Sequence, residues 1–351
     1  MNEQIKMRDT LTASRMASLL SCPRKHYYRY ELGLAREASV LALRFGSAFH
    51  DGMEGRWLGL SFHLCLERAL GKAERFDPLD AAILTCLLHG YYERYSGDGE
   101  CIAHIHPERE FRYPLKGSRT FDACGKIDGL GQLKDGRTCL LEHKTSGEDI
   151  SDGADFWMRL RFNPQIYQYV SAIHEEGDSP EVIVYDVTRK PTIKLRESVP
   201  TLDADGLKQV IDSDGNRVFK KDGTPKQTAD GAKGETLLSA PETVEQYADR
   251  LRADIVERPE YYYQRREVAV LANDLEEFEA QRINVGRMIL YFRTSAAKQA
   301  LPEWGWPRNC NGITCRMCDY ECFCMQNVHV TADQPPAGFT VGAVNPELLN
   351  G

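Results

Sequence analysis

No stretch of this sequence approaches the roughly 18 consecutive apolar residues that a membrane-spanning helix needs, so we expect no membrane partner. The opening residues, MNEQIKMRDT, lack the apolar core of a signal peptide, so we expect a cytoplasmic protein. The chain also has no GxxxxGK(S/T) phosphate loop, which excludes a nucleotide-driven motor of that type within it.

Positive charge is scarce as well, because 44 Lys and Arg stand against 52 Asp and Glu, for a net charge of −8. This balance argues against a uniformly basic coat for nucleic acid. A local basic channel remains open, because phosphate binding depends on where the cations lie. With 351 residues, 42% of them hydrophobic, the chain can form two domains or one large α/β domain with a satellite.

Two neighbouring segments, residues 122–128 and 138–144, have the pattern of β-strands, and the Asp-Gly pair between them is a strong hairpin signal. Because side chains alternate along a strand, Glu142 and Lys144 share one face, and the hairpin brings Asp128 near them. Two carboxylates and an ammonium on one face suit a metal-dependent phosphodiesterase. A solvated hairpin face would carry the same residues, and taken alone the motif favours that second interpretation.

Apolar periodicity elsewhere predicts a sheet flanked by helices. The predicted helices cover residues 10–36 with a break at Cys22-Pro23, 39–72, 78–96, 154–175, 243–256 and 275–298, and the predicted strands span about 103–144 (three antiparallel strands), 181–188 and 265–271. The strand at 181–188 follows a helical crossover and is β-branched, so we expect it to be buried in the sheet. Residues 190–240 are rich in Pro, Gly, Asp and Lys, which predicts an insertion that is partly hairpin and partly flexible.

The second helix of the N-terminal segment is both basic and aromatic. Arg24, Lys25 and Arg29 lie among tyrosines, a combination that suits a phosphate backbone with nearby bases. A solvated helix face over a tyrosine core explains the same pattern equally well.

Cysteine is unevenly distributed along the chain. Five of the eleven cysteines fall between Cys310 and Cys324, and in a reducing compartment such a cluster is more typical of a metal site than of disulfides. A local zinc site would use Cys310, Cys315, Cys318 and either Cys322 or Cys324.

In their joint order, these segments resemble the PD-(D/E)XK nucleases of the RecB type, and specifically the iron-sulfur branch that includes the nuclease domain of AddB and the four-cysteine exonucleases associated with CRISPR adaptation. The matching segments are Ser21–Leu34 with Cys22, Gly46-Ser-Ala-Phe-His50, Gly125-Lys-Ile-Asp128, Glu142-His-Lys144, Gln165-Ile-Tyr-Gln-Tyr169 and the final Cys315, Cys318 and Cys324. Each motif is weak by itself, but their order over residues 12–324 is specific. The resemblance covers nearly everything except the insertion and the tail.

The resemblance implies an α/β fold with a restriction-endonuclease-like core, a mixed sheet flanked by helices, and an iron-sulfur flap that joins the N- and C-terminal segments. The implied parts are an N-terminal helical segment with the first cluster cysteine (1–36), a nuclease core with the insertion at about 190–240 (37–300), a cysteine-rich iron-sulfur segment (301–328) and a tail (329–351).

The implied catalytic centre holds Mg²⁺ or Mn²⁺, the hard cations that oxygen ligands suit. Asp128 and Glu142 are the expected bridging carboxylates, with the backbone carbonyl of His143 as a third ligand. By the resemblance, His50 adds an imidazole ligand, which tilts the preference toward Mn²⁺. Lys144 would position or deprotonate the attacking water and stabilise developing charge.

The helix after the hairpin carries Gln165 and Tyr169, which lie one turn apart and share a face. By the resemblance, they orient Lys144 or the DNA strand. Ordinary polar residues of a helix would show the same spacing.

The resemblance also selects the ligands of a 4Fe-4S cluster, Cys22, Cys315, Cys318 and Cys324, and leaves Cys310 and Cys322 without a role. The local zinc site remains the competing hypothesis. Ligation by Cys22 would link positions that lie 315 − 22 = 293 apart, and the entropy of closing so long a loop makes the link worth up to roughly 5 kcal/mol.

The implied function is that of a metal-dependent DNA nuclease, an exonuclease on single strands or free DNA ends that acts in recombination, repair, replication or spacer acquisition. A helicase or a recombination or adaptation protein would be a separate partner. Two other hypotheses remain: a non-catalytic subunit that binds DNA ends or single strands, and a zinc-stapled nucleic-acid adaptor.

Overall fold

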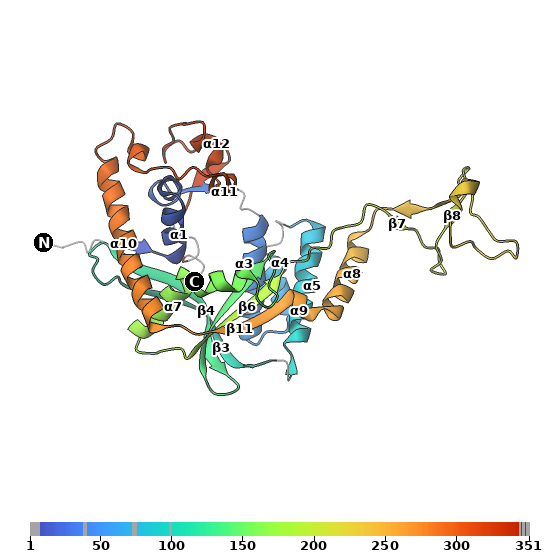
Figure 1. Ribbon diagram of the computed structural model, residues 1–351, viewed down its shortest axis with the longest axis horizontal. Helices are drawn as coiled ribbons and strands as arrows, with labels where there is room; N and C mark the ends of the chain where they lie inside the picture. The colour runs from blue at the N-terminus through green and yellow to red at the C-terminus, as the bar shows by residue number, and fades with distance from the viewer. Residues whose placement is uncertain are drawn as a thin grey trace.

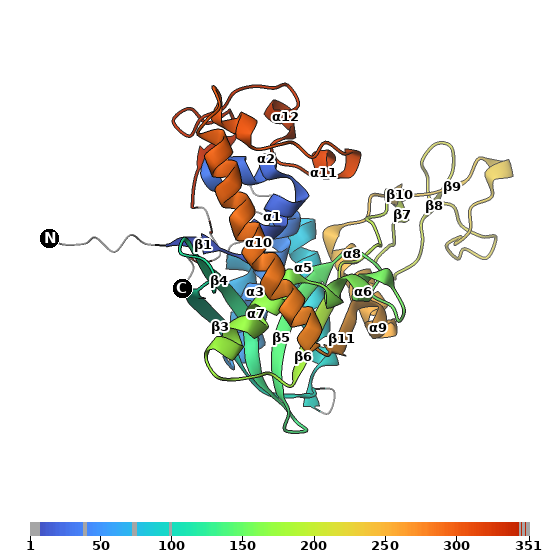
Figure 2. The same cartoon turned by 60° about the vertical axis from the view of Figure 1, so that its left-hand side comes forward.

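A mixed β-sheet lies at the centre of the computed structural model, which describes residues 8–37, 41–71, 76–97, 100–343, 345 and 348. Helices lie on both sides of this sheet (Figures 1 and 2). Its strand order is β1-β4-β5-β6-β11, and β3 pairs with β4 outside this path. The mixed sheet with flanking helices agrees with the predicted α/β class.

The strands form as the sequence predicts, with one addition. They are β1 (Asp9–Leu11), β3 (Ile102–Pro114), β4 (Phe121–Leu133), β5 (Thr138–Ser146), β6 (Val182–Arg189) and β11 (Tyr263–Val268). Strands β3, β4 and β5 are successively antiparallel, and β6 lies parallel to β5. The addition is β1, which pairs in parallel with β4 and so joins the N-terminal segment to the sheet.

Two predicted helices are each divided in the structure. The helix predicted over residues 39–72 is α3 (Leu41–Trp57) followed by α4 (Phe62–Gly71), and residues 39, 40 and 72 lie outside the described residues. Between them Gly59 has a φ of 76°, a left-handed conformation that ends a helix. The helix predicted over 154–175 is α6 (Asp155–Arg161) and α7 (Pro164–Glu175), because a proline disfavours helical backbone at the residue before it.

The remaining predicted helices form as α1 (Ala13–Ser21), α2 (Pro23–His26) with a π-helical continuation (Tyr27–Glu31), α5 (Pro78–Arg94), α8 (Val244–Glu257) and α10 (Ala272–Ala296). Three short helices have no counterpart among the predictions: α9 (Pro259–Tyr262), α11 (Gly312–Arg316) and α12 (Glu321–Cys324). None of the described helices is long and apolar enough to cross a membrane.

The two ends of the described chain pack against each other. Trp306 is 1% exposed and stacks on His26, with 5.2 Å between the ring centres, and it also contacts Tyr27 and Phe292. In the tail, β12 (Phe339–Val341) pairs with β2 (Leu34–Arg36). Figure 1 shows α1, α11 and α12 gathered beside the upper end of α10.

The insertion at residues 190–240 forms an arm that projects away from the sheet (Figure 1). Two short ladders lie in it, β7 (Val199–Pro200) with β10 (Ser239–Ala240) and β8 (Val210–Ile211) with β9 (Thr236–Leu237). Tight turns follow one another along the arm, with glycines of positive φ at Gly206, Gly215 and Gly223. The predicted hairpin character is confirmed.

Candidate active site

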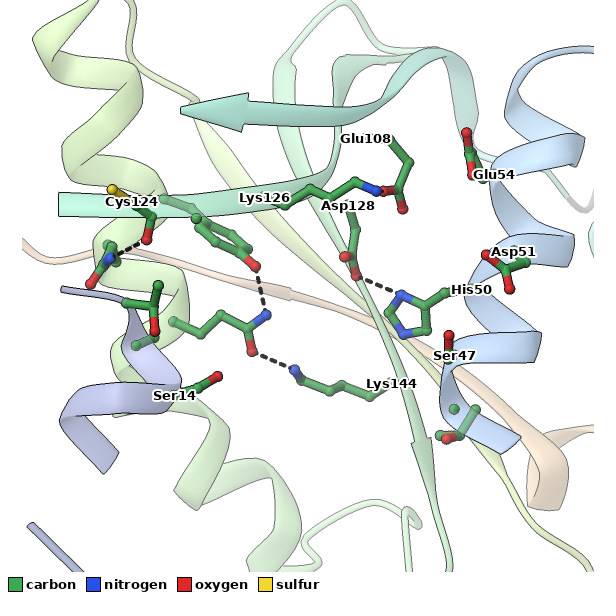
Figure 3. Close-up of a pocket in the computed structure, with 18 of the residues that line it drawn as sticks. Ser14, Ser47, His50, Asp51, Glu54, Glu108, Cys124, Lys126, Asp128 and Lys144 are labelled. Carbon is green, nitrogen blue, oxygen red and sulfur yellow. Dashed lines mark hydrogen bonds and ion pairs between the residues drawn. The ribbon is translucent and has the colours of Figure 1, made fainter. Parts of the chain in front are cut away.

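A pocket of about 800 Å³ opens where β4, β5, α3 and α7 meet, and α1 with its N-cap Thr12 closes one side. Residues from all five elements line it, among them His50, Asp128, Lys144, Gln165 and Tyr169 (Figure 3). The motifs that the sequence places up to about 120 positions apart therefore meet at one place.

The hairpin brings the carboxylates and the lysine together as predicted. The register that pairs Gly129 with Leu141 sets Asp128 beside Glu142. The ammonium of Lys144 forms an ion pair with Glu142, so both side chains lie on one face of β5. The backbone N–H of His143 donates to Oδ2 of Asp128 at 2.9 Å, which fixes this carboxylate against the next strand.

Gln165 and Tyr169 form a short chain of hydrogen bonds that ends on Lys144. The lysine Nζ donates to Oε1 of Gln165 at 2.8 Å, and Nε2 of Gln165 donates to the Tyr169 hydroxyl at 2.6 Å. Asn163 caps α7 by accepting from the backbone N–H of Gln165, so the first turn of the helix is held in place. Gln165 therefore contacts Lys144 directly, and Tyr169 acts on Lys144 through Gln165, in keeping with the orienting role predicted for these two residues.

His50 reaches the same centre from α3. Its Nδ1 lies 3.5 Å from Oδ2 of Asp128, and the two side chains point toward each other in Figure 3. Burial alone would lower the pKa of His50, but the charge of Asp128 outweighs it and raises the pKa. The imidazole therefore behaves as the partner of an ionised carboxylate.

The pKa values of Asp128 and Glu142 are shifted in opposite directions. Burial alone would raise the pKa of Asp128, but the charge and hydrogen bond of His50 hold it below its usual range. Burial and the charge of Asp128 raise the pKa of Glu142, against the opposing effect of Lys144. Strongly shifted neighbours of this kind are typical of functional sites.

The carboxylate oxygens of Asp128 and Glu142 are of the chemical type that a hard divalent cation prefers. Glu142 is completely buried, and its Oε2 has no hydrogen-bond partner among the described residues. A buried carboxylate oxygen without a partner is costly unless a cation or water satisfies it. As the side chains are placed, no group of three or more His, Cys, Asp or Glu in the described part of the chain is close enough to hold an ion.

The side chain of His143 has a role that the sequence does not reveal. Its imidazole is 3% exposed and is not among the residues that line the pocket. Nε1 of Trp57 donates to Nε2 of His143 at 2.9 Å, and Nδ1 of His143 lies 3.3 Å from Oδ2 of Asp186. Burial would raise the pKa of Asp186, but Arg265 and His143 outweigh it and hold this pKa at about 2. Trp57 lies seven residues after His50, two turns along the same helix face, which is the only sequence signal for this contact.

One of the predicted DNA contacts is buried. Arg24 is 5% exposed, and its Nε donates to the carbonyl of Trp306 at 2.9 Å. This guanidinium therefore links the N-terminal segment to the C-terminal one, and its predicted contact with DNA stays a prediction. Lys25 and Arg29 are half-buried, and neither is among the residues that line the active-site pocket.

A second, much smaller pocket, of about 20 Å³, lies between the N-terminal segment and the cysteine-rich segment. Its lining includes Cys22, Cys310, Cys315, Cys318 and Cys324. The backbone N–H of Asn309 donates to Sγ of Cys22 at 3.4 Å. Cys322 is exposed and is not part of this lining, so the structure separates the two cysteines that the resemblance leaves without a role.

Comparison with known proteins defines the class. The family model of the PD-(D/E)XK nuclease superfamily matches residues 10–325, so the chain belongs to this superfamily. No curated protein matches the sequence. Among solved structures, the crystal structure of SSO0001 is similar at 11% identity over 73% of this chain and 79% of that chain, with a TM-score of 0.26.

Proposed function

We propose that this protein is a metal-dependent deoxyribonuclease of the RecB type that hydrolyses phosphodiester bonds in single strands or at free DNA ends. The observation that supports it most is the environment of Glu142 beside Asp128. Glu142 is a buried carboxylate with one oxygen paired to Lys144 and the other without a partner among the described residues. Members of the superfamily to which the chain belongs are generally nucleases.

Asp128, Glu142, His50 and the backbone carbonyl of His143 are the groups that would hold Mg²⁺ or Mn²⁺. Such an ion, when bound, neutralises charge on phosphate oxygens and lowers the pKa of a bound water. The nitrogen ligand from His50 favours Mn²⁺, since imidazole suits transition metals better than Mg²⁺.

Lys144 acts on the attacking water, and Gln165 and Tyr169 hold Lys144 in position. Lys144 keeps an N–H directed at Gln165 and another at Glu142, so its ammonium is fixed in the pocket, where it positions the attacking water and stabilises the charge that develops on the phosphate. Burial would lower the pKa of Lys144, but Glu142 outweighs burial and raises it, so the group enters the reaction protonated. Tyr169 fixes Gln165 and through it the direction of Lys144.

The cysteine pocket would hold a 4Fe-4S cluster through Cys22, Cys315, Cys318 and Cys324. Soft thiolates suit such a cluster, and the position of Cys22 beside the C-terminal cysteines supports it over a site made of C-terminal cysteines alone. Cys310 lines the same pocket and is the alternative fourth ligand. A helicase, recombination or adaptation protein would supply the unwound strand or the free end.

Digestion of end-labelled DNA tests the nuclease proposal. Linear and circular substrates, single- and double-stranded, are incubated with Mg²⁺, with Mn²⁺ and without metal. We expect cleavage of linear single strands with metal only, and a loss of about 10²–10⁴-fold in rate for Lys144→Ala. Lys116→Ala is the matched control, because this exposed lysine pairs with Glu175 away from the pocket. Binding of DNA without cleavage by the wild type would instead support a non-catalytic subunit.

A further inference from the structure

Glu108 has an unusual backbone at a position that faces the active site. Its φ is 59°, and among the described residues only Asn327 shares a positive φ without being glycine. Asparagine tolerates this left-handed conformation, whereas glutamate adopts it only at a cost in energy. In β3, Pro107 pairs with Gly129 and Arg109 with Ile127, so Glu108 stands opposite Asp128 of β4. Strain of this kind persists where the surroundings impose it, and it gathers at functional sites.

The side chain of Glu108 forms an ion pair with Lys126. Lys126 lies two residues before Asp128 on β4, so both point to the same face of the sheet. Both members of the pair line the active-site pocket, with 18% and 22% of their side chains exposed. In Figure 3 the carboxylate and the ammonium meet beside Asp128, across the pocket from Lys144.

Stability alone does not account for this arrangement. In a largely buried ion pair the cost of desolvation offsets much of the Coulomb gain, and here the pair stands against the strain of a left-handed glutamate and the repulsion between two carboxylates on opposing strands. Without Glu108, the ammonium of Lys126 would be drawn to Asp128 and would compete there with a metal ion. With Glu108, the ammonium stays in the pocket while the metal ligands remain available.

An ammonium in this place suits a phosphate. It has three N–H donors, of which Glu108 engages one, and it lies on the strand that also carries Asp128. When the scissile phosphate of a polynucleotide lies at Asp128 and Glu142, the next phosphate along the strand lies against another side of the same pocket. Lys126 is the cation that β4 offers on that side.

We propose that Lys126, held in place by Glu108, binds the phosphate of a nucleic-acid strand next to the one that is cleaved. This assignment rests on the proposed nuclease function. It adds a substrate contact that distinguishes a polynucleotide from a lone phosphodiester.

Binding of fluorescent single-stranded DNA, measured by anisotropy at several salt concentrations, tests the contact. Lys144→Ala serves as the parent so that DNA stays intact in the presence of Mg²⁺. Loss of one phosphate contact lowers the slope of log affinity against log salt by about 0.7, and we expect this for Lys126→Met together with about tenfold weaker binding. Arg109→Met is the control, because it removes one positive charge from β3 outside the pocket, where Arg109 pairs with Glu176. An unchanged slope for Lys126→Met overturns the proposal.

Two substitutions of Glu108 separate function from folding. Glu108→Gly and Glu108→Gln both remove the carboxylate, but only glycine relieves the left-handed strain. We expect Glu108→Gly to unfold at a higher temperature than Glu108→Gln, while both weaken DNA binding to a similar extent. Normal binding by Glu108→Gly overturns the role of Glu108. If the wild type cleaves no DNA but the slope still falls for Lys126→Met, the nuclease proposal fails and the phosphate contact stands.

Discussion

The active-site pocket and the cysteine pocket are held together in different ways. In the first, charged and polar groups hold one another, as when Lys144 bonds both Glu142 and Gln165. In the second, residues 293 positions apart (315 − 22) approach through packing of aromatic rings, with Trp306 between the N-terminal segment and α10. The difference follows from the chemistry of the side chains in each pocket: carboxylates in a protein interior need counter-charges at all times, whereas thiols tolerate apolar surroundings.

This contrast predicts that the two pockets respond to different changes. Removing a proposed cysteine ligand should mainly lower the free energy of unfolding, because the link that closes a long loop of the chain is lost. Removing a hydrogen bond behind the active site should affect metal binding first, because the fold there has many other contacts. The following tests are ordered from the largest expected effect to the smallest.

Cys22→Ser is expected to lose iron and to lower the free energy of unfolding by up to roughly 5 kcal/mol, since it opens a loop of almost the whole chain. Iron content and thermal unfolding of anaerobically purified protein measure the two effects. Cys322→Ser is the matched control, because Cys322 is exposed outside the cysteine pocket. Full iron content in Cys22→Ser together with its loss in Cys310→Ser would show instead a site made of C-terminal cysteines.

Acidification is expected to loosen the N-terminal segment through His26. Burial, with Arg15 and Arg293, lowers the pKa of His26 from 6.5 to about 3. The unfolded chain therefore binds a proton that the folded protein does not. This contribution to stability is complete above pH 6.5 and is lost as the pH falls toward 3, by about 2 kcal/mol at pH 5.

Urea unfolding at pH 7 and at pH 5 measures this effect, with His26→Gln as the comparison. The variant removes the titrating group, so its stability should fall less than that of the wild type over the same interval. An equal fall in both proteins would mean that other groups dominate and that His26 does not couple pH to the packing around Trp306.

Trp57→Phe is expected to have the smallest effect on folding and a clear effect on metal binding. It removes the N–H that His143 accepts but keeps an aromatic ring. A lost hydrogen bond to a buried group costs about 1–2 kcal/mol, so we expect about tenfold more Mn²⁺ for half-maximal cleavage. Tyr263→Phe, which removes a buried hydrogen bond to the Leu87 carbonyl, should leave the Mn²⁺ requirement unchanged. If both variants need the same Mn²⁺ concentration for half-maximal cleavage, Trp57 has no role in metal binding.

Local patterns were sufficient for the hairpin and for the parallel strand β6. Alternation placed Glu142 and Lys144 on one face, and the Asp-Gly turn set the two strands against each other. The same patterns could not foresee the division of two helices, because Gly59 and Pro164 act through local backbone geometry that apolar periodicity does not register.

Contacts across the fold were beyond the sequence. The partners of His143, Trp57 and Asp186, come from α3 and β6. The spacing of Trp57 from His50 hints at the first contact, and no spacing indicates the second. The burial of Arg24 was also beyond the sequence. Its basic neighbourhood suggested a DNA surface, yet the fold buries it against Trp306. Charge in a sequence does not tell which side of a helix the rest of the chain covers.

By itself, then, the sequence determined the chemical groups and their local order: two carboxylates and a lysine on a hairpin, a histidine on a helix, and a glutamine one turn before a tyrosine. Only the tertiary structure decided which distant segments meet. The register of β3 against β4 set Glu108 opposite Asp128. Packing around Trp306 brought Cys22 to the C-terminal cysteines. The physical reason is that hydrophobic periodicity indicates which face of a segment is buried, whereas the segments that cover this face are determined by packing over the whole chain.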